Sequence, residues 1–237
     1  MSDRCQVCGG REAMPLVHQE PHLWLRCPDC KFAWVSPPPG DGACEGGTAH
    51  LEAQVAKRRA RMRRARRRVR KLAQRMPGPR LLDVGSGIGC IVAAAAERGL
   101  EATGIESDPL LLEEARRQGA GGRFLSTDLE TLAAGAMRFD GIYCSETIER
   151  HADSNRFLRQ LAHLMTPGGA LFLTTPALRE FARGSEPSRW RHFGAPGRKV
   201  CFSPANIRTQ LLKHGFGQVR VLFNYGRGIK LFATRSS

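Results

Sequence analysis

The sequence lacks any long apolar run and has few aromatic residues. Its 237 residues are 41% hydrophobic and only 7% aromatic. No stretch approaches the roughly 20 consecutive apolar residues that a membrane-spanning helix needs. The first five residues also lack the apolar segment of a secretory signal. These absences argue against a membrane-spanning or exported protein, and we expect a cytoplasmic protein with no membrane partner.

Acidic residues are scarce, and one basic segment has none. Lys and Arg number 37 against 22 Asp and Glu, which gives a net charge of +15. Twelve of the basic residues lie between residues 57 and 75, so the remainder of the chain holds 25 basic and 22 acidic residues. The basicity therefore belongs to one predicted helix and does not by itself indicate a nucleic-acid-binding protein.

Eight cysteines in a chain without an export signal argue against a disulfide framework. Four of them form two pairs with the spacing of metal ligands, Cys5-x-x-Cys8 and Cys27-x-x-Cys30, separated by 18 residues. Four thiolates complete a tetrahedral zinc site and leave no open position, so the predicted zinc is structural. A module of some 36 residues has too small a core to fold without such an ion.

Glycine and proline clusters divide the chain into four predicted parts. These are a zinc ribbon over residues 1–36, a linker over 37–50, an Arg-rich helix over 51–76 and an α/β domain over 77–237. The helix carries an apolar stripe at spacings of three and four, which predicts that it packs on the domain. The stripe consists of Met62, Ala65, Val69, Leu72 and Met76.

Within residues 77–237, predicted strands alternate with predicted helices, which indicates a parallel, doubly wound sheet. The predicted elements of this alternating part are strands over 80–84, 102–105, 124–125, 141–144 and 170–174, and helices over 90–98, 109–118 and 155–165. A helix over 204–214 then precedes two strands, 219–223 and 230–233, that a Gly-rich turn joins. Such a hairpin predicts an antiparallel edge.

The turn after the first predicted strand is rich in glycine, which lets backbone come close to a bound nucleotide. Asp83 is followed by Gly85, Ser86, Gly87 and Gly89. The spacing is Gly-x-Gly-x-Gly and not the Gly-x-Gly-x-x-Gly that places a pyrophosphate on a helix N-terminus. The Asp83 carboxylate would repel phosphates and suits a cationic ligand better. S-adenosylmethionine has a sulfonium, an ammonium and no phosphate, so the turn favours this cofactor.

Two acids follow later strands at positions that fit the rest of that cofactor. Glu106 ends the second predicted strand, 21 residues after Gly85, where a carboxylate can accept the ribose hydroxyls. Asp128 follows the third strand, and we expect it to meet the exocyclic amine of adenine. Further on, Pro-Gly-Gly at residues 167–169 predicts a tight turn before the fifth strand.

With these features in register, the chain resembles the class I S-adenosylmethionine-dependent methyltransferases over residues 79–235. The resemblance rests on the glycine turn, on Glu106, on Phe-Asp-Gly-Ile-Tyr at 139–143 and on the Pro-Gly-Gly turn. It implies a Rossmann-like, seven-stranded α/β sheet with the cofactor across the C-terminal ends of strands one and two. In one branch of this family a four-cysteine ribbon precedes the catalytic domain, and a Trp-x-His-Phe segment like that at 190–193 follows the fifth strand.

The methyl acceptor is expected beyond the fourth predicted strand, at residues 145–153. Methyl transfer needs an aligned acceptor and, for a hydroxyl or carbon acid, a base. Ser145 is a candidate cofactor contact, and Glu146 and His151 are candidate catalytic residues. A third candidate is His192, which lies in a segment that resembles the lid of related enzymes.

Two departures from the family pattern concern the base. Related enzymes commonly read Glu-His where this chain reads Glu149-Arg150, and the nearest histidine is then His151, about 100° further around if the segment is helical. They often read Glu-His again where this chain reads Gly197-Arg198. The departures fit a substrate that needs no base, an anionic substrate held by the two arginines, or a loss of activity.

The sequence therefore favours a methyltransferase that acts on a small molecule, a sugar or a biosynthetic intermediate. An alternative is an RNA methyltransferase that binds phosphates with its ribbon and Arg-rich helix, with an affinity that falls steeply with salt. The apolar stripe on that helix and the low aromatic content speak against it. A second alternative, suggested by the missing histidines, is a non-catalytic cofactor-binding protein.

Overall fold

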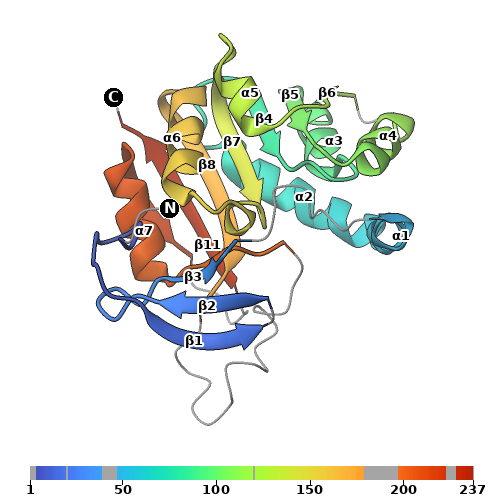
Figure 1. Ribbon diagram of the computed structural model, residues 1–237. Helices are drawn as coiled ribbons and strands as arrows, with labels where there is room; N and C mark the ends of the chain where they lie inside the picture. The colour runs from blue at the N-terminus through green and yellow to red at the C-terminus, as the bar shows by residue number, and fades with distance from the viewer. Residues whose placement is uncertain are drawn as a thin grey trace.

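The computed structural model describes residues 4–19, 21–38, 47–119, 121–178, 197–222 and 228–236. Its centre is a seven-stranded sheet with the strand order β10-β11-β8-β7-β4-β5-β6 (Figure 1). The parallel strands are β4 (Arg80–Val84), β5 (Glu101–Ile105), β6 (Arg123–Leu125), β7 (Phe139–Ser145) and β8 (Met165–Pro176).

The last two strands of the sheet run against the others. β11 (Gly228–Arg235) pairs with β8 in antiparallel register, and β10 (Phe216–Val221) pairs with β11 in the same way. The predicted seven-stranded α/β sheet with an antiparallel C-terminal edge is thereby confirmed. Because β4 is flanked by β5 and β7, chain connections leave it in opposite directions, and a crevice for ligands is expected at its C-terminal end.

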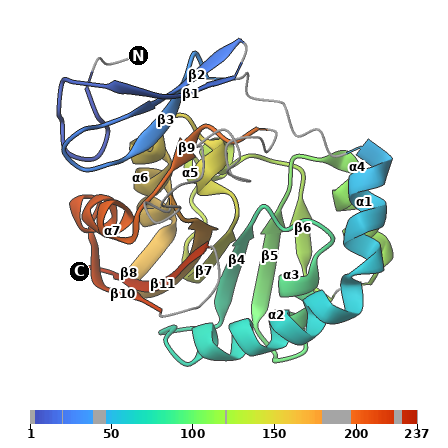
Figure 2. The ribbon, with the colours of Figure 1, turned by 90° about the horizontal axis from the view of Figure 1, so that it is seen from below.

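Helices cover both faces of this sheet (Figure 2). The helices are α1 (Gly47–Ala56), α2 (Arg58–Ala73), α3 (Cys90–Ala96), α4 (Pro109–Arg117), α5 (Leu129–Ala133), α6 (Ser154–Leu164) and α7 (Pro204–Lys213). α2 and α3 pack on one face, and α5, α6 and α7 on the other. Asp108, Asp153 and Ser203 accept backbone N–H bonds at the starts of α4, α6 and α7, which fixes where these helices begin. None of the described helices is both long and apolar enough to span a membrane.

The Arg-rich segment differs from the single helix expected over 51–76. α1 begins at Gly47, inside the range expected to be a linker, and α2 starts after Lys57, whose ψ of 5° interrupts the helix. α1 turns away from α2 and packs beside α4, beyond β6 (Figure 2). The apolar stripe of α2 is buried against α3 and the sheet, as its spacing predicts.

Three arginines at the Arg-rich helix contact specific partners in the domain. Arg66 makes two hydrogen bonds of 2.8 Å to the Glu97 carboxylate. The Arg68 guanidinium lies 5.9 Å from the ring centre of Tyr143, and that of Arg75 lies 4.4 Å from the ring centre of Phe232. Cation–π contacts of this kind attach the helix to aromatic residues of the sheet, so part of the basic charge serves packing.

The N-terminal residues form a second, smaller sheet, although their sequence shows little regular pattern. Its strands are β1 (Met14–Gln19), β2 (His22–Arg26), β3 (Ala33–Ser36) and β9 (Val200–Cys201), all antiparallel. β9 comes from the far end of the chain, so the small sheet is completed by residues that follow β8. Cys5, Val7 and Phe32 belong to the same buried cluster as Ile148 and Phe202, so the N-terminal residues share the main core. The four-part division of the chain stays a prediction.

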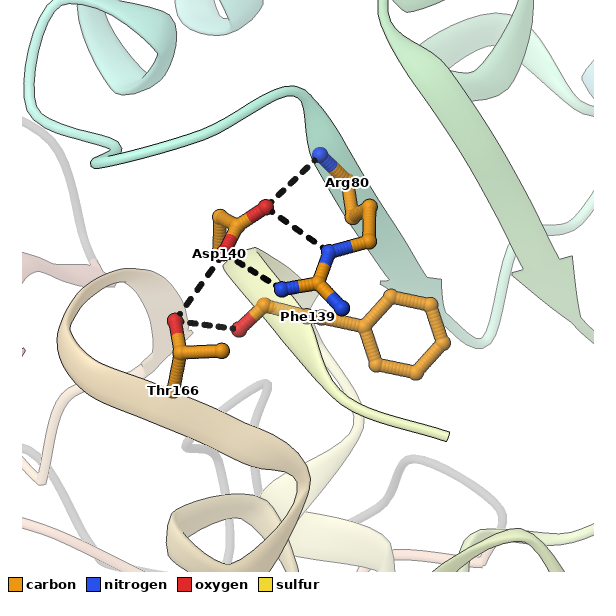
Figure 3. A network of polar contacts seen from close by, with 4 residues as sticks. All are labelled: Arg80, Phe139, Asp140 and Thr166. Atoms are coloured by element: carbon orange, nitrogen blue, oxygen red, sulfur yellow. Dashed lines mark hydrogen bonds and ion pairs between the residues drawn. The ribbon is translucent and has the colours of Figure 1, made fainter. Parts of the chain in front are cut away.

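A polar network joins the ends of the strands opposite the expected site (Figure 3). The Arg80 guanidinium donates two hydrogen bonds of 3.0 Å to Asp140, and Thr166 Oγ1 donates to Asp140 and to the Phe139 carbonyl. This hydrogen-bonded guanidinium holds the pKa of Asp140 below its ordinary value. The Pro-Gly-Gly residues at 167–169 lie within β8, where they form an irregularity in its pairing with β7 and not a separate turn before the strand.

Candidate active site

The glycine turn joins β4 to α3 at the C-terminal end of the parallel strands. Gly85, Gly87 and Gly89 have φ angles of 72°, 53° and 75°, a region that side chains other than glycine rarely occupy. The N–H groups of Gly85 and Ser86 donate to the Ile105 carbonyl at 3.0 Å, and that of Gly89 donates to the Ser86 carbonyl at 3.0 Å. These donors are satisfied within the protein, so they do not form a phosphate-binding nest.

Glu106 lies directly beside the turn. Its carboxylate is 9% exposed and accepts hydrogen bonds from the backbone N–H groups of Gly87 at 2.8 Å, Ser107 at 2.9 Å and Asp108 at 3.1 Å. A carboxylate has about four acceptor positions, so these bonds leave capacity for a ligand hydroxyl. The backbone bonds fix the carboxylate at the edge where the sequence places the ribose.

Asp83 is the penultimate residue of β4, and it is buried, 2% exposed. Burial and the nearby charge of Glu106 raise the pKa of Asp83 well above its ordinary value. Within the described ranges no cation pairs with it. A buried carboxyl group without a counter-ion is unfavourable, and a cationic ligand group would stabilise its charged form.

Asp128 and Ser145, the remaining predicted cofactor contacts, both have partners inside the protein. Asp128 caps α5 by accepting the Thr131 N–H at 2.7 Å, and this bond lowers the pKa of its carboxyl group. Ser145 Oγ shares a hydrogen bond of 2.7 Å with Thr174 Oγ1 at the ends of β7 and β8. Their predicted contacts with a cofactor stay predictions.

Glu146 begins the segment after β7. Its φ of 58° is unusual for a residue other than glycine, and its N–H donates to the Thr174 carbonyl at 2.9 Å. Its half-exposed carboxylate lies 3.7 Å from the Arg198 guanidinium. Arg198 thus reaches the segment in which the acceptor is expected, whereas Arg150, the other departure from the family pattern, is exposed on the surface.

Glu149 is an acid in this segment that the sequence does not single out as a site residue. It is 1% exposed and accepts a hydrogen bond of 3.0 Å from Thr175 Oγ1. Burial, together with the charge of Glu146, raises the pKa of Glu149 to about 8. The available signal was the glutamate that related enzymes share at this position. Only the fold shows that Glu149 is buried in a short 3₁₀ turn, η1 (Ile148–Arg150).

The two candidate histidines are placed differently. His151 follows η1, and its ring centre lies 4.4 Å from that of Phe157 in α6. His192 lies outside the described residues. Glu146 is therefore the candidate catalytic residue that the structure places at the end of β7, beside the strand that carries the glycine turn.

Two further residues, Thr147 and Gln54, lie over the turn and have no sequence motif to mark them. A Cβ atom built at Gly85 would lie 3.0 Å from Thr147 Oγ1, and one built at Gly87 would lie 3.2 Å from Gln54 Oε1. Thr147 Oγ1 donates to the Val84 carbonyl at 3.2 Å. Gln54 comes from α1, which is remote from the turn in sequence and reaches it only through the fold.

Residues 55–221 match a family model described as a methyltransferase domain. The chain belongs to this methyltransferase family. Ubiquinone biosynthesis O-methyltransferases of Coxiella burnetii (strain Dugway 5J108-111) and Xanthomonas campestris pv. campestris (strain B100) are 35% and 36% identical to it over 104 and 105 residues. Each alignment covers 42% of this chain and 44% of the relative, so the chain matches less than half the length of these curated relatives.

Solved methyltransferase structures share the fold. Magnesium protoporphyrin IX methyltransferase from Synechocystis PCC 6803 matches with a TM-score of 0.55 and 19% identity, over 83% of this chain and 87% of that one. The CcbJ methyltransferase from Streptomyces caelestis matches with a TM-score of 0.58 and 16% identity, over 73% and 95% of the two chains. At these identities the matches establish a common fold.

The N-terminal residues hold a cluster of four cysteine thiols. The Sγ atoms of Cys5, Cys8, Cys27 and Cys30 all lie within 4.8 Å of one another. Cys5 and Cys30 are 3.5 Å apart, as are Cys8 and Cys27, whereas a disulfide would hold sulfurs at about 2.05 Å. Ligands at about 2.3 Å around a tetrahedral zinc ion lie roughly 3.8 Å apart, so the cluster has the size of such a site. No described histidine joins it.

The cysteine cluster is tied to the segment that follows β7 and η1. Gln6, between the first two cysteines, donates from its side-chain amide to the Ala152 carbonyl at 2.6 Å. Its side-chain oxygen accepts from the Ser154 N–H at 3.0 Å, and its backbone carbonyl accepts from the Asn155 amide at 3.0 Å. The cluster is thus attached to the segment in which the methyl acceptor is expected.

Proposed function

We propose that this protein transfers the methyl group of S-adenosylmethionine to a small-molecule acceptor. The observation that carries the proposal is the buried Asp83 carboxyl group, which pairs with no cation among the described residues. It lies next to Glu106 and to a turn in which the N–H groups of residues 85, 86, 87 and 89 are already bonded. A dinucleotide would bring phosphates to two carboxylates and to a turn in which four N–H groups are already bonded within the protein. S-adenosylmethionine would bring an ammonium to Asp83 and ribose hydroxyls to Glu106.

The remaining predicted residues complete the proposed site. Asp128 would meet the adenine amine, while Ser86 and Ser145 would line the path of the cofactor between β4 and β7. When bound, the cofactor supplies a methyl group on a sulfonium. The family match supports methyl transfer, and relatives named for ubiquinone biosynthesis and for magnesium protoporphyrin IX support a small-molecule acceptor.

On the acceptor side, Glu146 is the proposed base for an acceptor that must lose a proton. It is half exposed at the end of β7, and its carboxylate lies 3.7 Å from the Arg198 guanidinium. His151 and His192 are the other proposed catalytic residues. An acceptor whose reacting atom carries no proton to be removed would need none of these three residues.

We further propose a structural zinc ion at Cys5, Cys8, Cys27 and Cys30. The proposal is supported by the size of the cluster and by its four-thiolate composition, which satisfies zinc and leaves no position for a reactant. Its proposed role is to hold the N-terminal residues against the segment that follows β7.

Calorimetric titration with S-adenosylmethionine and S-adenosylhomocysteine tests the proposed cofactor. We expect micromolar binding of both by the wild type, and Glu106→Ala should weaken it by at least about tenfold, the scale of losing hydrogen bonds to a charged group. Glu101→Ala, at the exposed opposite end of the same strand, is the matched control and should leave binding unchanged. Preferential binding of NAD, or unchanged affinity in Glu106→Ala, would overturn the proposal.

A further inference from the structure

The outward face of α2 is a continuous row of cations. From residue 59 to residue 71, every position on the side opposite the buried apolar stripe is basic, with the exception of Ala60. The basic side chains of this side are all exposed, and all but the last are arginines. The α2 basic face consists of Arg59, Arg63, Arg64, Arg67, Arg70 and Lys71.

The α2 basic face has no acidic partner within the part of the chain that the structure describes. Arg66, at the edge of the face, is the α2 residue that forms a described ion pair, and its partner is Glu97. Like charges three and four residues apart on a helix repel one another, so the row weakens the helix that carries it. A bound anion would remove this repulsion.

Packing holds the α2 basic face in a fixed place on the domain. Met62, Ala65, Val69 and Leu72 are buried against α3 and the sheet, and α2 lies along one face of the sheet (Figure 2). An amphipathic helix binds a bilayer by inserting its apolar side, and the apolar side of α2 is already used inside the protein. The exposed side therefore offers charge alone, on a rigid support.

The size and the chemistry of the α2 basic face match a nucleic-acid backbone. The helix from Arg59 to Lys71 spans about 18 Å, a length over which each strand of a double helix carries roughly five phosphates. Guanidinium groups bind phosphate oxygens through two parallel hydrogen bonds. α2 has no aromatic side chain that could stack on unpaired bases, so the face fits a double helix better than a single strand.

We propose that the α2 basic face binds the phosphate backbone of double-stranded nucleic acid. Phosphate contacts place a protein on a duplex and carry no sequence information, so the binding is independent of base sequence. The face lies on one side of the sheet, whereas the glycine turn lies at the C-terminal end of β4. The duplex is therefore a partner at a second site and not the methyl acceptor, and the inference does not depend on the proposed function.

Fluorescence anisotropy with labelled DNA and RNA duplexes of about 20 base pairs, longer than the face itself, tests the proposal. If all six cations contact phosphates, raising the salt from about 50 to about 100 mM should weaken wild-type binding about fortyfold. The combined variant Arg63→Gln, Arg67→Gln and Arg70→Gln should bind at least about tenfold more weakly at about 50 mM salt. The same salt step should then weaken its binding only about sixfold.

The matched control is the combined variant Arg159→Gln, Arg208→Gln and Lys213→Gln. It removes the same charge from exposed positions of α6 and α7, which pack on the opposite face of the sheet. Its duplex affinity should stay within about threefold of wild type and its salt dependence should not change. Both variants should keep the wild-type melting temperature within a few degrees and the wild-type affinity for S-adenosylhomocysteine.

Three results would overturn the proposal: equal weakening in both variants, which would mean that binding follows net charge, no duplex binding at about 50 mM salt, or tighter binding of a single strand of the same length. Binding of phosphatidylglycerol and phosphatidylcholine vesicles that depends on α2, without duplex binding, would also overturn it and place a lipid surface there instead. A preference between the DNA and RNA duplexes that is lost in the α2 variant supports the site and identifies the source of the phosphates.

Discussion

The proposed cofactor side and the proposed acceptor side of the site are built in different ways. The cofactor side consists of one continuous turn, residues 83–89, and of single acids at the ends of the next two strands. The acceptor side brings together Glu146, Glu149 and Arg198, which come from separate parts of the chain. The first is specified locally by backbone conformation, and the second exists only when distant segments have packed.

A chain of contacts shows how far the acceptor side depends on the N-terminal sheet. The Val35 N–H in β3 donates to the Lys199 carbonyl at 2.9 Å, and the Lys199 N–H donates to the Glu149 carbonyl at 2.7 Å. Gln6 makes its own bonds to residues 152–155. The cysteine cluster and the small sheet therefore hold the acceptor side in place from outside the main sheet.

Cys27→Ser should have the largest effect and should separate the two sides. Loss of one thiolate should reduce bound zinc well below one ion per chain and lower the melting temperature by at least about 10 °C, since each kcal/mol corresponds to about 2–4 °C in a domain of this size. Metal analysis and calorimetry measure both. Hydrogen exchange should rise at residues 148–155 and much less at 83–89.

The control for this prediction is Cys44→Ser, which changes a cysteine outside the two pairs and should keep the zinc. Equal zinc content in Cys27→Ser and wild type would contradict the metal site. If hydrogen exchange rose equally at residues 148–155 and at residues 83–89, the two sides would not differ in their dependence on the cysteine cluster.

Gly89→Ala should damage the cofactor side alone. Gly89 and Gly99 have nearly the same φ, 75° and 74°, but a Cβ at Gly89 would lie 2.7 Å from Phe124 Cζ, whereas one at Gly99 meets nothing within 4 Å. Gly99→Ala should therefore cost only the backbone strain of about 1–2 kcal/mol. Gly89→Ala should cost more and weaken S-adenosylhomocysteine binding by at least about tenfold. Equal stability and equal affinity of the two variants would show that the close approach of Phe124 to Gly89 does not exclude a side chain at this position.

Glu149→Gln should change how stability depends on pH. Because burial raises the pKa of Glu149 from 4.5 to about 8, the folded protein binds a proton more tightly than the unfolded chain, and this stabilisation is lost as the pH rises through that range. The variant cannot ionise, so its melting temperature relative to wild type should increase by several degrees between pH 5 and pH 9. Glu113→Gln, on the exposed face of α4, should show no such trend. A constant difference across pH would mean that Glu149 titrates normally.

Asp140→Asn should have the smallest effect on the site, because Asp140 is the second residue of β7 and lies at the end of the strand opposite the site. The Arg80 guanidinium lowers the pKa of Asp140, so its carboxylate stabilises the fold above its ordinary pKa and this stabilisation is lost as the pH falls. We expect a melting temperature lower by a few degrees at pH 7 and a smaller difference near pH 3. Cofactor affinity should not change; a change would mean that the two ends of the sheet are coupled.

Much of the fold is readable from the sequence, because its elements follow from local patterns. Six predicted strands of the main sheet fall within the observed ones, whereas the strand predicted over 219–223 only overlaps β10, which ends at Val221. The apolar stripe of α2 is buried as its spacing predicts. The strands of the N-terminal sheet were not predicted, because their sequence shows little regular pattern. β1, β2 and β3 pair with their neighbours in sequence, whereas β9 joins β3 from more than 160 residues away. The start of α1 falls in the range predicted to be a linker. Its packing against α4 is a tertiary contact, which local sequence patterns do not show.

The sequence by itself determines the glycine turn, the acids that follow β5 and β6, and the four-cysteine spacing. Each of these depends on backbone conformation or on spacing over a few residues. The tertiary structure decides that Gln54 lies over Gly87, that Arg198 lies beside Glu146 and that Glu149 is buried. Burial and charge pairing depend on which segments meet in space, and local sequence patterns do not specify that.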